Sequence, residues 1–119
     1  MSNQTYISFY LKSNTIRVFK SSIKAINAPM YIRFRINNET NQMIIEPYNK
    51  KKFTSFRVPQ NLFDVEGSME LHSKSFCRIM SNRMKWDYNR SYRIPGKIYL
   101  EQKIIMFDLS QAKLINEIK

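Results

Sequence analysis

Tyr6-Ile-Ser-Phe-Tyr-Leu11, near the start of the chain, has the same order of apolar and polar residues as Phe53-Thr-Ser-Phe-Arg-Val58. Three more pairs of segments follow in the same order: Ile16–Val18 with Met69–Leu71, Tyr31–Phe34 with Ser91–Ile94, and Gln42–Ile45 with Lys103–Met106. The offset grows from 47 residues in the first pair to 61 in the last, as loop insertions in a duplicated unit would make it grow. The alternative is chance resemblance between short apolar strands, which four matches in one order disfavour. The sequence therefore predicts two tandem units.

The first unit is predicted to contain two strands, a short helix and a β-hairpin. Period-two alternation predicts strands over 6–11 and 15–19 and a hairpin over 31–46. Ser21 or Ser22 is expected to cap the helix, and Pro29 is expected to stop it. The residues expected to point inward are Ile7, Phe9, Leu11, Ile16, Val18, Ile23, Ile26, Ile32, Phe34 and Ile36.

The second unit is predicted to repeat this order with a longer helix. Strands are expected over 53–58 and 68–71, and Ser73 or Ser75 is expected to cap the helix. Its apolar stripe is predicted from helical spacing to be Phe76, Ile79, Met80 and Met84. The last strands are expected over 92–94 and 98–109, interrupted at Pro95-Gly96 and at Glu101-Gln102. A final helix from Ser110 is expected to carry Leu114, Ile115 and Ile118.

The predicted fold is mainly β with short helices. Four short strands cannot bury both faces of a sheet alone, so the two strand–strand–helix–hairpin units are expected to form a pseudo-twofold β barrel or sandwich. The expected boundaries are 1–47 for the first unit, 48–52 for a basic linker, 53–109 for the second unit and 110–119 for the short C-terminal helix. Together they are expected to make one compact domain.

The charge of the chain favours an anionic partner. The 119 residues include 20 Lys and Arg against nine Asp and Glu, a net charge of +11. Residues 1–60 carry ten basic and two acidic side chains, whereas residues 61–119 carry ten and seven. A field of this sign attracts polyanions, nucleic acid above all. The single cysteine, Cys77, excludes an internal disulfide, and the chain shows neither a signal peptide nor an apolar run of about 20 residues. A cytoplasmic protein without a membrane partner is expected.

Part of the first unit resembles a known family. Thr15–Ile26, Tyr31–Ile36 and Met43–Pro47 resemble the AbrB/SpoVT-type swapped-hairpin DNA-binding domain, and 68–109 resembles it more weakly. MraZ-like members carry two such units in one chain, which interleave their hairpins into one barrel. The resemblance implies DNA binding through Arg17, Lys20 and Lys24. The aligned positions of the second unit are Glu70, Ser73 and Cys77, which lack the basic set.

Further basic residues extend this predicted nucleic-acid surface. The full candidate set is Arg17, Lys20, Lys24, Arg33, Arg35, Lys50, Lys51, Lys52 and Arg57. Lys and Arg contacts to phosphates give affinity without reading sequence. The alternative is an ordinary solvated face, since outward strand positions must be polar in any case. The tyrosines between these charges (Tyr6, Tyr10, Tyr31, Tyr48, Tyr88 and Tyr92) could stack on unpaired bases, but strand packing is the favoured interpretation.

Nothing in the sequence indicates catalysis. No Cys/His cluster has the spacing of a metal site, and no Gly-rich phosphate loop is present. His72 and Cys77 are five residues apart across a predicted strand-to-helix junction, so Cys77 is interpreted as a small buried side chain. Trp86 is expected to be half-buried, with an exposed partner anchor as the alternative. We expect no enzyme, no cofactor and no metal.

Two functions of different class follow. The leading prediction is a small DNA-binding protein that acts as a transcriptional regulator. A homodimer is expected to suit this role, because a twofold assembly matches the symmetry of palindromic sites. The alternative is a protein-binding module. Richness in Asn, Lys, Ile and Tyr indicates an AT-rich genome, such as that of a phage or mobile element. Such a protein could bind and inhibit a host nucleic-acid-handling protein, as anti-CRISPR proteins do. A structural or RNA-binding role is a third interpretation.

Overall fold

The computed structural model describes residues 3–50, 55–59 and 68–115. Its strands in these ranges are β1 (Gln4–Tyr10), β2 (Thr15–Phe19), β3 (Tyr31–Asn37), β4 (Gln42–Tyr48), β5 (Ser55–Arg57), β6 (Ser68–His72), β7 (Ser91–Tyr99), β8 (Ile104–Asp108) and β9 (Lys113–Leu114). The helices are α1 (Lys20–Ala25) and α2 (Lys74–Met84), with 3-10 turns at η1 (Leu11–Ser13) and η3 (Leu109–Gln111).

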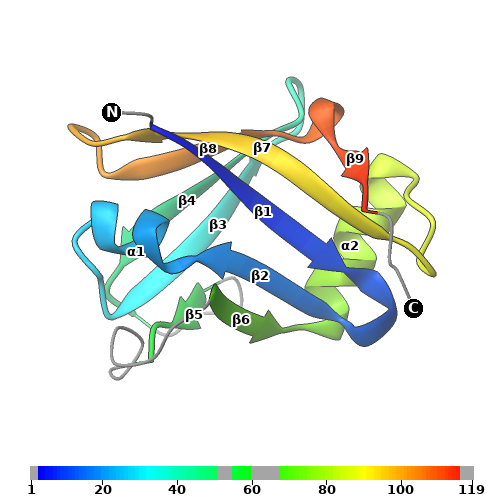
Figure 1. Cartoon of the computed structure of the whole chain (residues 1–119), viewed down its shortest axis with the longest axis horizontal. Coiled ribbons are helices and arrows are strands. Elements are labelled where there is room, and N and C mark those ends of the chain that lie inside the picture. The colour runs from blue at the N-terminus through cyan, green and yellow to red at the C-terminus, as the bar shows by residue number, and fades with distance from the viewer. Residues whose placement is uncertain (1–2, 51–54, 60–67, 116–119) are drawn as a thin grey trace.

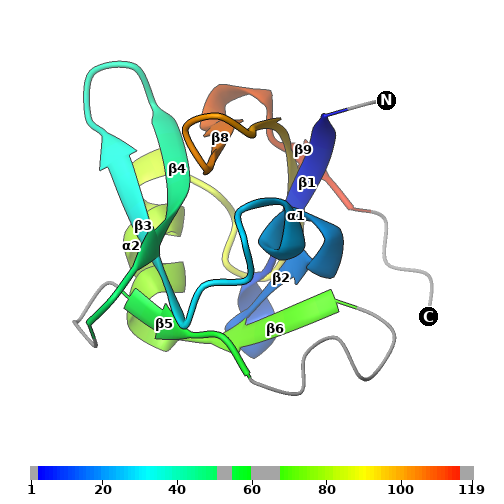
Figure 2. The ribbon, with the colours of Figure 1, turned by 90° about the vertical axis from the view of Figure 1, so that its left-hand side faces the viewer.

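All the described strands belong to one antiparallel sheet that curls into a nearly closed barrel. The strand order is β5-β3-β4-β8-β7-β1-β2-β6, and β9 pairs with β7 beside this path. The two ends of the order, β5 and β6, lie near each other (Figures 1 and 2). The prediction of a mainly β fold is confirmed, and the sheet has the shape of a nearly closed barrel.

The interior of the barrel is filled mostly by side chains that were predicted to point inward, from alternation in the strands and from the short helix for Ile23 and Ile26. The fully or almost fully buried ones include Ile7, Phe9, Leu11, Ile16, Val18, Ile23, Ile26, Ile32, Phe34, Met43 and Ile45. Arg17 and Arg35, at the intervening positions, are exposed. A period-two pattern can bury one set only by exposing the other. Burial at about 25 cal/mol per Å² of apolar surface therefore fixes which face of each strand is outside.

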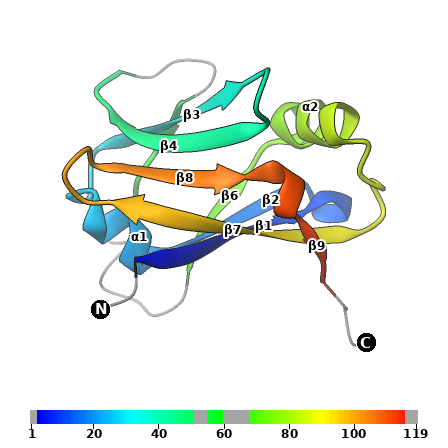
Figure 3. The ribbon, with the colours of Figure 1, turned by 90° about the horizontal axis from the view of Figure 1, so that it is seen from above.

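The two helices lie at opposite ends of the barrel-like sheet (Figures 1 and 3). The hydroxyl of Ser73 accepts the Phe76 N–H at 3.2 Å, which confirms the predicted cap of α2. The predicted apolar stripe is wrong at Ile79, which is 49% exposed, whereas Cys77 and Met80 are buried. α1 begins at Lys20, and no side chain caps it. Ser22 is instead buried and shares a hydrogen bond with the Thr5 hydroxyl.

Arg83 of α2 fastens the β3–β4 hairpin. Its guanidinium donates to the side-chain carbonyl of Asn38 at 2.8 Å, to that of Asn41 at 2.9 Å and to the backbone carbonyl of Asn37 at 3.3 Å. Three donors of one planar group thus reach three acceptors of one turn. The hairpin that carries Arg33 and Arg35 is held in place by this contact.

Two further predictions for the second half are wrong in detail. β7 continues through Pro95-Gly96 without a break. One edge of β7 pairs with β9 at Tyr92 and Arg93 and with β8 from Gly96 onward. Pro95 lies between these two paired stretches, so its missing N–H removes no hydrogen bond of either ladder. The predicted helix from Ser110 is absent from the described residues: the 3-10 turn η3 ends at Gln111, and β9 follows it. The Ile115 N–H then donates to the Ser91 carbonyl at 2.9 Å. The predictions for 51–54 and 116–119 lie outside the described residues.

Candidate nucleic-acid interface

The structure divides the described residues of the predicted basic set among four places. Arg33, Arg35 and Arg57 lie at outward positions of the neighbouring strands β3 and β5. Arg17 lies on β2, and β6 and β5 separate it from β3 around the barrel (Figure 2). Lys20 and Lys24 belong to α1 at one end of the barrel. Lys50 is exposed just beyond β4, and Lys51 and Lys52 lie outside the described residues.

Arg33 and Arg35 are held by one carboxylate. Glu46 on β4 is the register partner of Arg33, and its carboxylate lies 3.1 Å from Arg33 Nη2 and 3.4 Å from Arg35 Nη1. The Arg33 guanidinium also lies over the Tyr48 ring, 4.4 Å from its centroid. The side chain of Arg33 is 29% exposed and that of Arg35 is 60% exposed. Arg33 is thus the anchored residue, and Arg35 is the more accessible one.

Arg57 completes what we call the arginine cluster, namely Arg33, Arg35 and Arg57 on the outer face of the neighbouring strands β3 and β5. Arg57 is exposed at the outer position opposite Tyr31. Three guanidinium groups against one carboxylate leave a formal charge of +2. Guanidinium groups form two parallel hydrogen bonds to a phosphate and remain charged at any physiological pH. The arrangement suits the capture of phosphates by Arg35 and Arg57.

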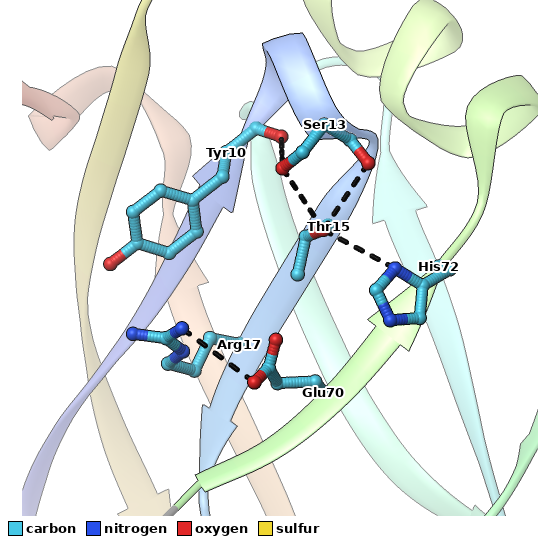
Figure 4. Close-up of polar contacts among 6 residues, drawn as sticks. All are labelled: Tyr10, Ser13, Thr15, Arg17, Glu70 and His72. Atoms are coloured by element: carbon cyan, nitrogen blue, oxygen red, sulfur yellow. Dashed lines mark hydrogen bonds and ion pairs between the residues drawn. The ribbon is translucent and has the colours of Figure 1, made fainter.

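Arg17 is engaged differently (Figure 4). Its Nη2 lies 3.6 Å from Glu70 Oε1, and its guanidinium lies over the Tyr10 ring, 4.9 Å from the centroid. Arg17 and Glu70 are register partners on β2 and β6. Both side chains are well exposed, so the pair contributes between zero and about 1 kcal/mol and is screened by salt. A phosphate can therefore compete for Arg17.

The two lysines of α1 are not equivalent. Lys24 is exposed, whereas the Lys20 ammonium is buried and has no hydrogen-bond partner within the described residues. A buried ammonium cannot reach a phosphate outside the protein in this conformation. Of the three positions implied by the family resemblance, Arg17 and Lys24 are accessible, and they lie on different elements.

The aromatic residues split between the core and the surface. Trp86 is half-buried, as predicted: its ring stacks on Tyr92 with centroids 4.9 Å apart and lies 5.5 Å from Phe9. Tyr6 packs edge-on against Phe19 of the neighbouring strand, with centroids 6.4 Å apart, and is 42% exposed on the outer face of β1. The residues that surround Tyr6 were not predictable locally, because they come from β7, β9 and the residue after β9, which are remote along the chain.

His72 and Cys77 lie on different elements, β6 and α2. Cys77 is fully buried on α2. His72, at the exposed end of β6, contacts the Thr15 hydroxyl through Nδ1 at 3.3 Å (Figure 4). In the described part of the chain, no group of three or more His, Cys, Asp and Glu residues could hold a metal ion. Among the same residues, no helix has the length and apolar character that crossing a membrane requires.

Cys77 should be unreactive in the native protein. Burial raises the pKa of its thiol from 9.0 to about 11, which leaves roughly 100-fold less thiolate near neutral pH. Iodoacetamide at about pH 8 should therefore modify the folded protein far more slowly than the urea-unfolded protein, as followed by mass spectrometry. Because the folded pKa is the higher one, this thiol stabilises the fold below pH 9.0, and its contribution is lost as the pH rises toward 11. Equal alkylation rates would contradict this burial.

No protein-family model matches the chain, and neither the curated proteins nor the solved structures include a match. The AbrB/SpoVT-type resemblance therefore stays a prediction from the residues.

Proposed function

We propose that this protein is a small DNA-binding protein of the transcriptional-regulator type, and that it binds duplex phosphates through the arginine cluster. The observation that carries the proposal is that Arg33, Arg35 and Arg57 share the outer face of the neighbouring strands β3 and β5, where the Glu46 carboxylate holds Arg33 and Arg35. The net charge of +11 would draw DNA to this face. Arg35 and Arg57 would contact phosphates, while Arg33 and Glu46 keep the cluster ordered.

We further propose that the barrel consists of two tandem units that have exchanged hairpins. The strand order supports this. Exchanging β1 with β5, β2 with β6, β3 with β7 and β4 with β8 turns the run β5-β3-β4-β8-β7-β1 into itself, read backwards. β1 pairs with β7 of the second hairpin, and β5 pairs with β3 of the first. Each unit thus supplies a strand to the other unit's hairpin.

The two hairpins also share their turn geometry. Both have four residues between their strands, and the last of these, Asn41 or Lys103, has a positive φ of 56° or 57°. By this criterion Phe34 corresponds to Gly96, and Ile45 corresponds to Phe107. The two pairs face each other in register, Phe34 with Ile45 and Gly96 with Phe107. Phe34 lies on the first strand of its hairpin, and Phe107 lies on the second strand of the other hairpin. The two rings would therefore fill equivalent space in the two units.

The regulator proposal is tested by salt-dependent binding to a duplex. We expect fluorescence anisotropy to detect binding to a random duplex of about 20 base pairs at about 50 mM salt. If four phosphates are contacted, affinity should fall roughly 100-fold by about 200 mM. The double variant Arg35→Ala/Arg57→Ala should lower the slope of log K against log salt by about 2.

The matched control removes the same charge elsewhere. Arg78 and Arg90, on α2 and in the turn that follows it, are both exposed. Arg78→Ala/Arg90→Ala should leave the slope nearly unchanged, since only long-range attraction is altered. Equal losses from the two double variants would show that binding does not involve the arginine cluster.

Absence of duplex binding at about 50 mM salt would reject the DNA proposal and favour the second candidate, a cytoplasmic inhibitor of a nucleic-acid-handling protein. One observation favours that candidate. A pocket of about 200 Å³ opens between β3, β5 and α2, and its lining is mostly apolar, with Phe34, Phe56, Phe76 and Ile79 among its residues. An exposed apolar depression of this kind is a usual place for a protein partner.

A further inference from the structure

A row of cations crosses the outer face of four neighbouring strands. Lys113 of β9 is the register partner of Arg93 of β7, and Arg93 is the partner of Ser8 of β1. Ser8 is in turn the partner of Arg17 of β2. Neighbouring strands lie about 4.8 Å apart, so the row from Lys113 to Arg17 spans roughly 14 Å. Lys113, Arg93 and Arg17 are exposed, and Glu70 follows them at the end of the row.

Two exposed aromatic rings lie beside these cations, Tyr6 two residues before Ser8 on β1 and Phe19 two residues after Arg17 on β2. Tyr6 of β1 is 42% exposed, and Phe19 of β2 is 40% exposed. Their ring centroids are 6.4 Å apart, and the planes are nearly perpendicular at 85°. Successive outward residues of a strand are about 7 Å apart, so the two rings lie close to the row of cations. We call Tyr6, Phe19, Arg17, Arg93 and Lys113 the ring-and-cation face.

The face also contains a depression next to Tyr6. Its volume is about 380 Å³, and it is lined by Tyr6, Arg93, Pro95, Lys113, Leu114 and Ile115. The Arg93 guanidinium lies 5.9 Å from the centroid of the Tyr6 ring, and its Nε donates to the Ser8 hydroxyl at 3.4 Å. The depression has an apolar floor with cations at its rim, and its volume is within the range of small-molecule sites. It could receive one planar base.

We propose that the ring-and-cation face binds a single strand of nucleic acid. The phosphates would follow Lys113, Arg93 and Arg17, and unpaired bases would stack on Tyr6 and Phe19. Aromatic rings beside a basic track are the common design of single-strand binding sites, because every base has a π face. A duplex cannot use the rings, since its bases are already stacked within the helix. The positive row favours this occupant over an apolar or basic partner.

This site is separate from the arginine cluster. In the sheet, β4 and β8 lie between β3, which carries Arg33 and Arg35, and β7, which carries Arg93. Around the other side of the barrel, β6 lies between β2, which carries Arg17, and β5, which carries Arg57 (Figure 2). The two sites therefore share no residue, and the rings Tyr6 and Phe19 belong to the ring-and-cation face alone. The inference does not rest on the proposed duplex binding, and the two can fail independently.

Glu70 is placed to limit the affinity of the face. Its carboxylate lies 3.6 Å from Arg17, where a phosphate of the bound strand would compete with it. Glu70→Gln removes that competitor and a repelling charge, and it retains a side chain of nearly the same shape. The variant should bind single strands about threefold more tightly or better, with a steeper salt dependence.

The test compares single strands with a duplex for the same variants. Labelled oligonucleotides of about 15 thymidines or 15 uridines are used at about 50 mM salt, within the usual range of site sizes. Tyr6→Leu/Phe19→Leu keeps apolar side chains and removes both rings. We expect it to weaken single-strand binding at least about tenfold and to leave duplex binding within twofold. Tyr99→Leu, which removes an outward ring elsewhere on β7, should change neither affinity.

Each outcome decides the proposal. No binding of either oligonucleotide to the wild-type protein would overturn it, as would single-strand affinity unchanged by Tyr6→Leu/Phe19→Leu. Equal losses for single strands and duplex would also overturn it, because a stacking site acts on unpaired bases alone. Both rings are exposed, and the thermal unfolding curve of each variant identifies loss of fold. The relative affinity for thymidine and uridine strands distinguishes DNA from RNA as the ligand.

Discussion

Gly96→Ala should destabilise the protein by about 3 kcal/mol. A Cβ at this position of β7 would lie 2.4 Å from two ring carbons of Phe107 and 3.0 Å from the backbone carbonyl oxygen of Met106. Phe107 is fully buried, so its ring cannot move into solvent. The carbonyl belongs to the β8 backbone, which is fixed by the ladder to β7. Both neighbours resist displacement, and the strain must be spread over the core.

Urea denaturation followed by circular dichroism measures this effect. Phe107→Leu alone should also destabilise the protein, because it leaves a cavity. In the double variant Gly96→Ala/Phe107→Leu the new methyl group partly occupies that cavity. The double variant should therefore be more stable than the sum of the single effects predicts. Additive losses, or a Gly96→Ala variant as stable as the wild type, would contradict the close contact between β7 and β8.

Phe9→Ala should have an effect of about 3 to 5 kcal/mol, the largest expected from a single truncation. Phe9 is fully buried on β1, and its ring centroid lies 5.5 Å from that of Trp86 and 6.1 Å from that of Phe76. Truncation removes the ring that joins β1 to α2 and to the turn after it. The cavity left behind cannot collapse fully, because the surrounding strands are fixed by their ladders.

Phe19→Ala is the matched control for this truncation. The same substitution on the neighbouring strand removes a ring that is 40% exposed, so it should cost less than about 1 kcal/mol. Trp86 is the one tryptophan of the chain, and its emission reports the unfolding of both variants. Similar midpoints for Phe9→Ala and Phe19→Ala would show that the core is not organised around Phe9.

The sequence predicted which residues of the early strands face inward, because that property is local. Alternation requires Ile7 and Phe9 to share a face and puts Arg17 on the opposite side from Ile16. The strand partners were not predictable, because pairing depends on the whole chain. Nothing local indicates that Ser8 lies between Arg17 and Arg93, although this register creates the ring-and-cation face.

If the chain consists of two tandem units, as proposed above, the alignment of their apolar runs shifts by one position. The sequence aligned Met43-Ile-Ile45 with Ile104-Ile-Met106. The turns instead make Met43 correspond to Ile105, because Gln42 and Ile104 both follow the positive-φ residue. Both alignments match apolar residues, so composition cannot choose between them, yet a one-residue slip reverses every side chain. Burial chooses the second alignment, since Met43 and Ile105 are both inside.

The candidate site was predicted in part. Alternation placed Arg33 and Arg35 outward, and the structure brings Arg57 to the neighbouring strand. The carboxylate that holds the cluster was not foreseen, because Glu46 reaches Arg33 only in the register of β3 with β4. The burial of the Lys20 ammonium was not foreseen either, since exposure depends on how α1 meets the barrel.

Duplex binding by the arginine cluster is tested most directly by an NMR titration of ¹⁵N-labelled protein with a random duplex at about 50 mM salt. If the arginine cluster binds the duplex, we expect the largest chemical-shift changes at the amides of β3 and β5 and at the side-chain Nε–H groups of Arg35 and Arg57. Changes at Tyr6 and Phe19 should be small with a duplex. Unchanged spectra, or changes centred on Phe76 and Ile79 instead, would contradict the account.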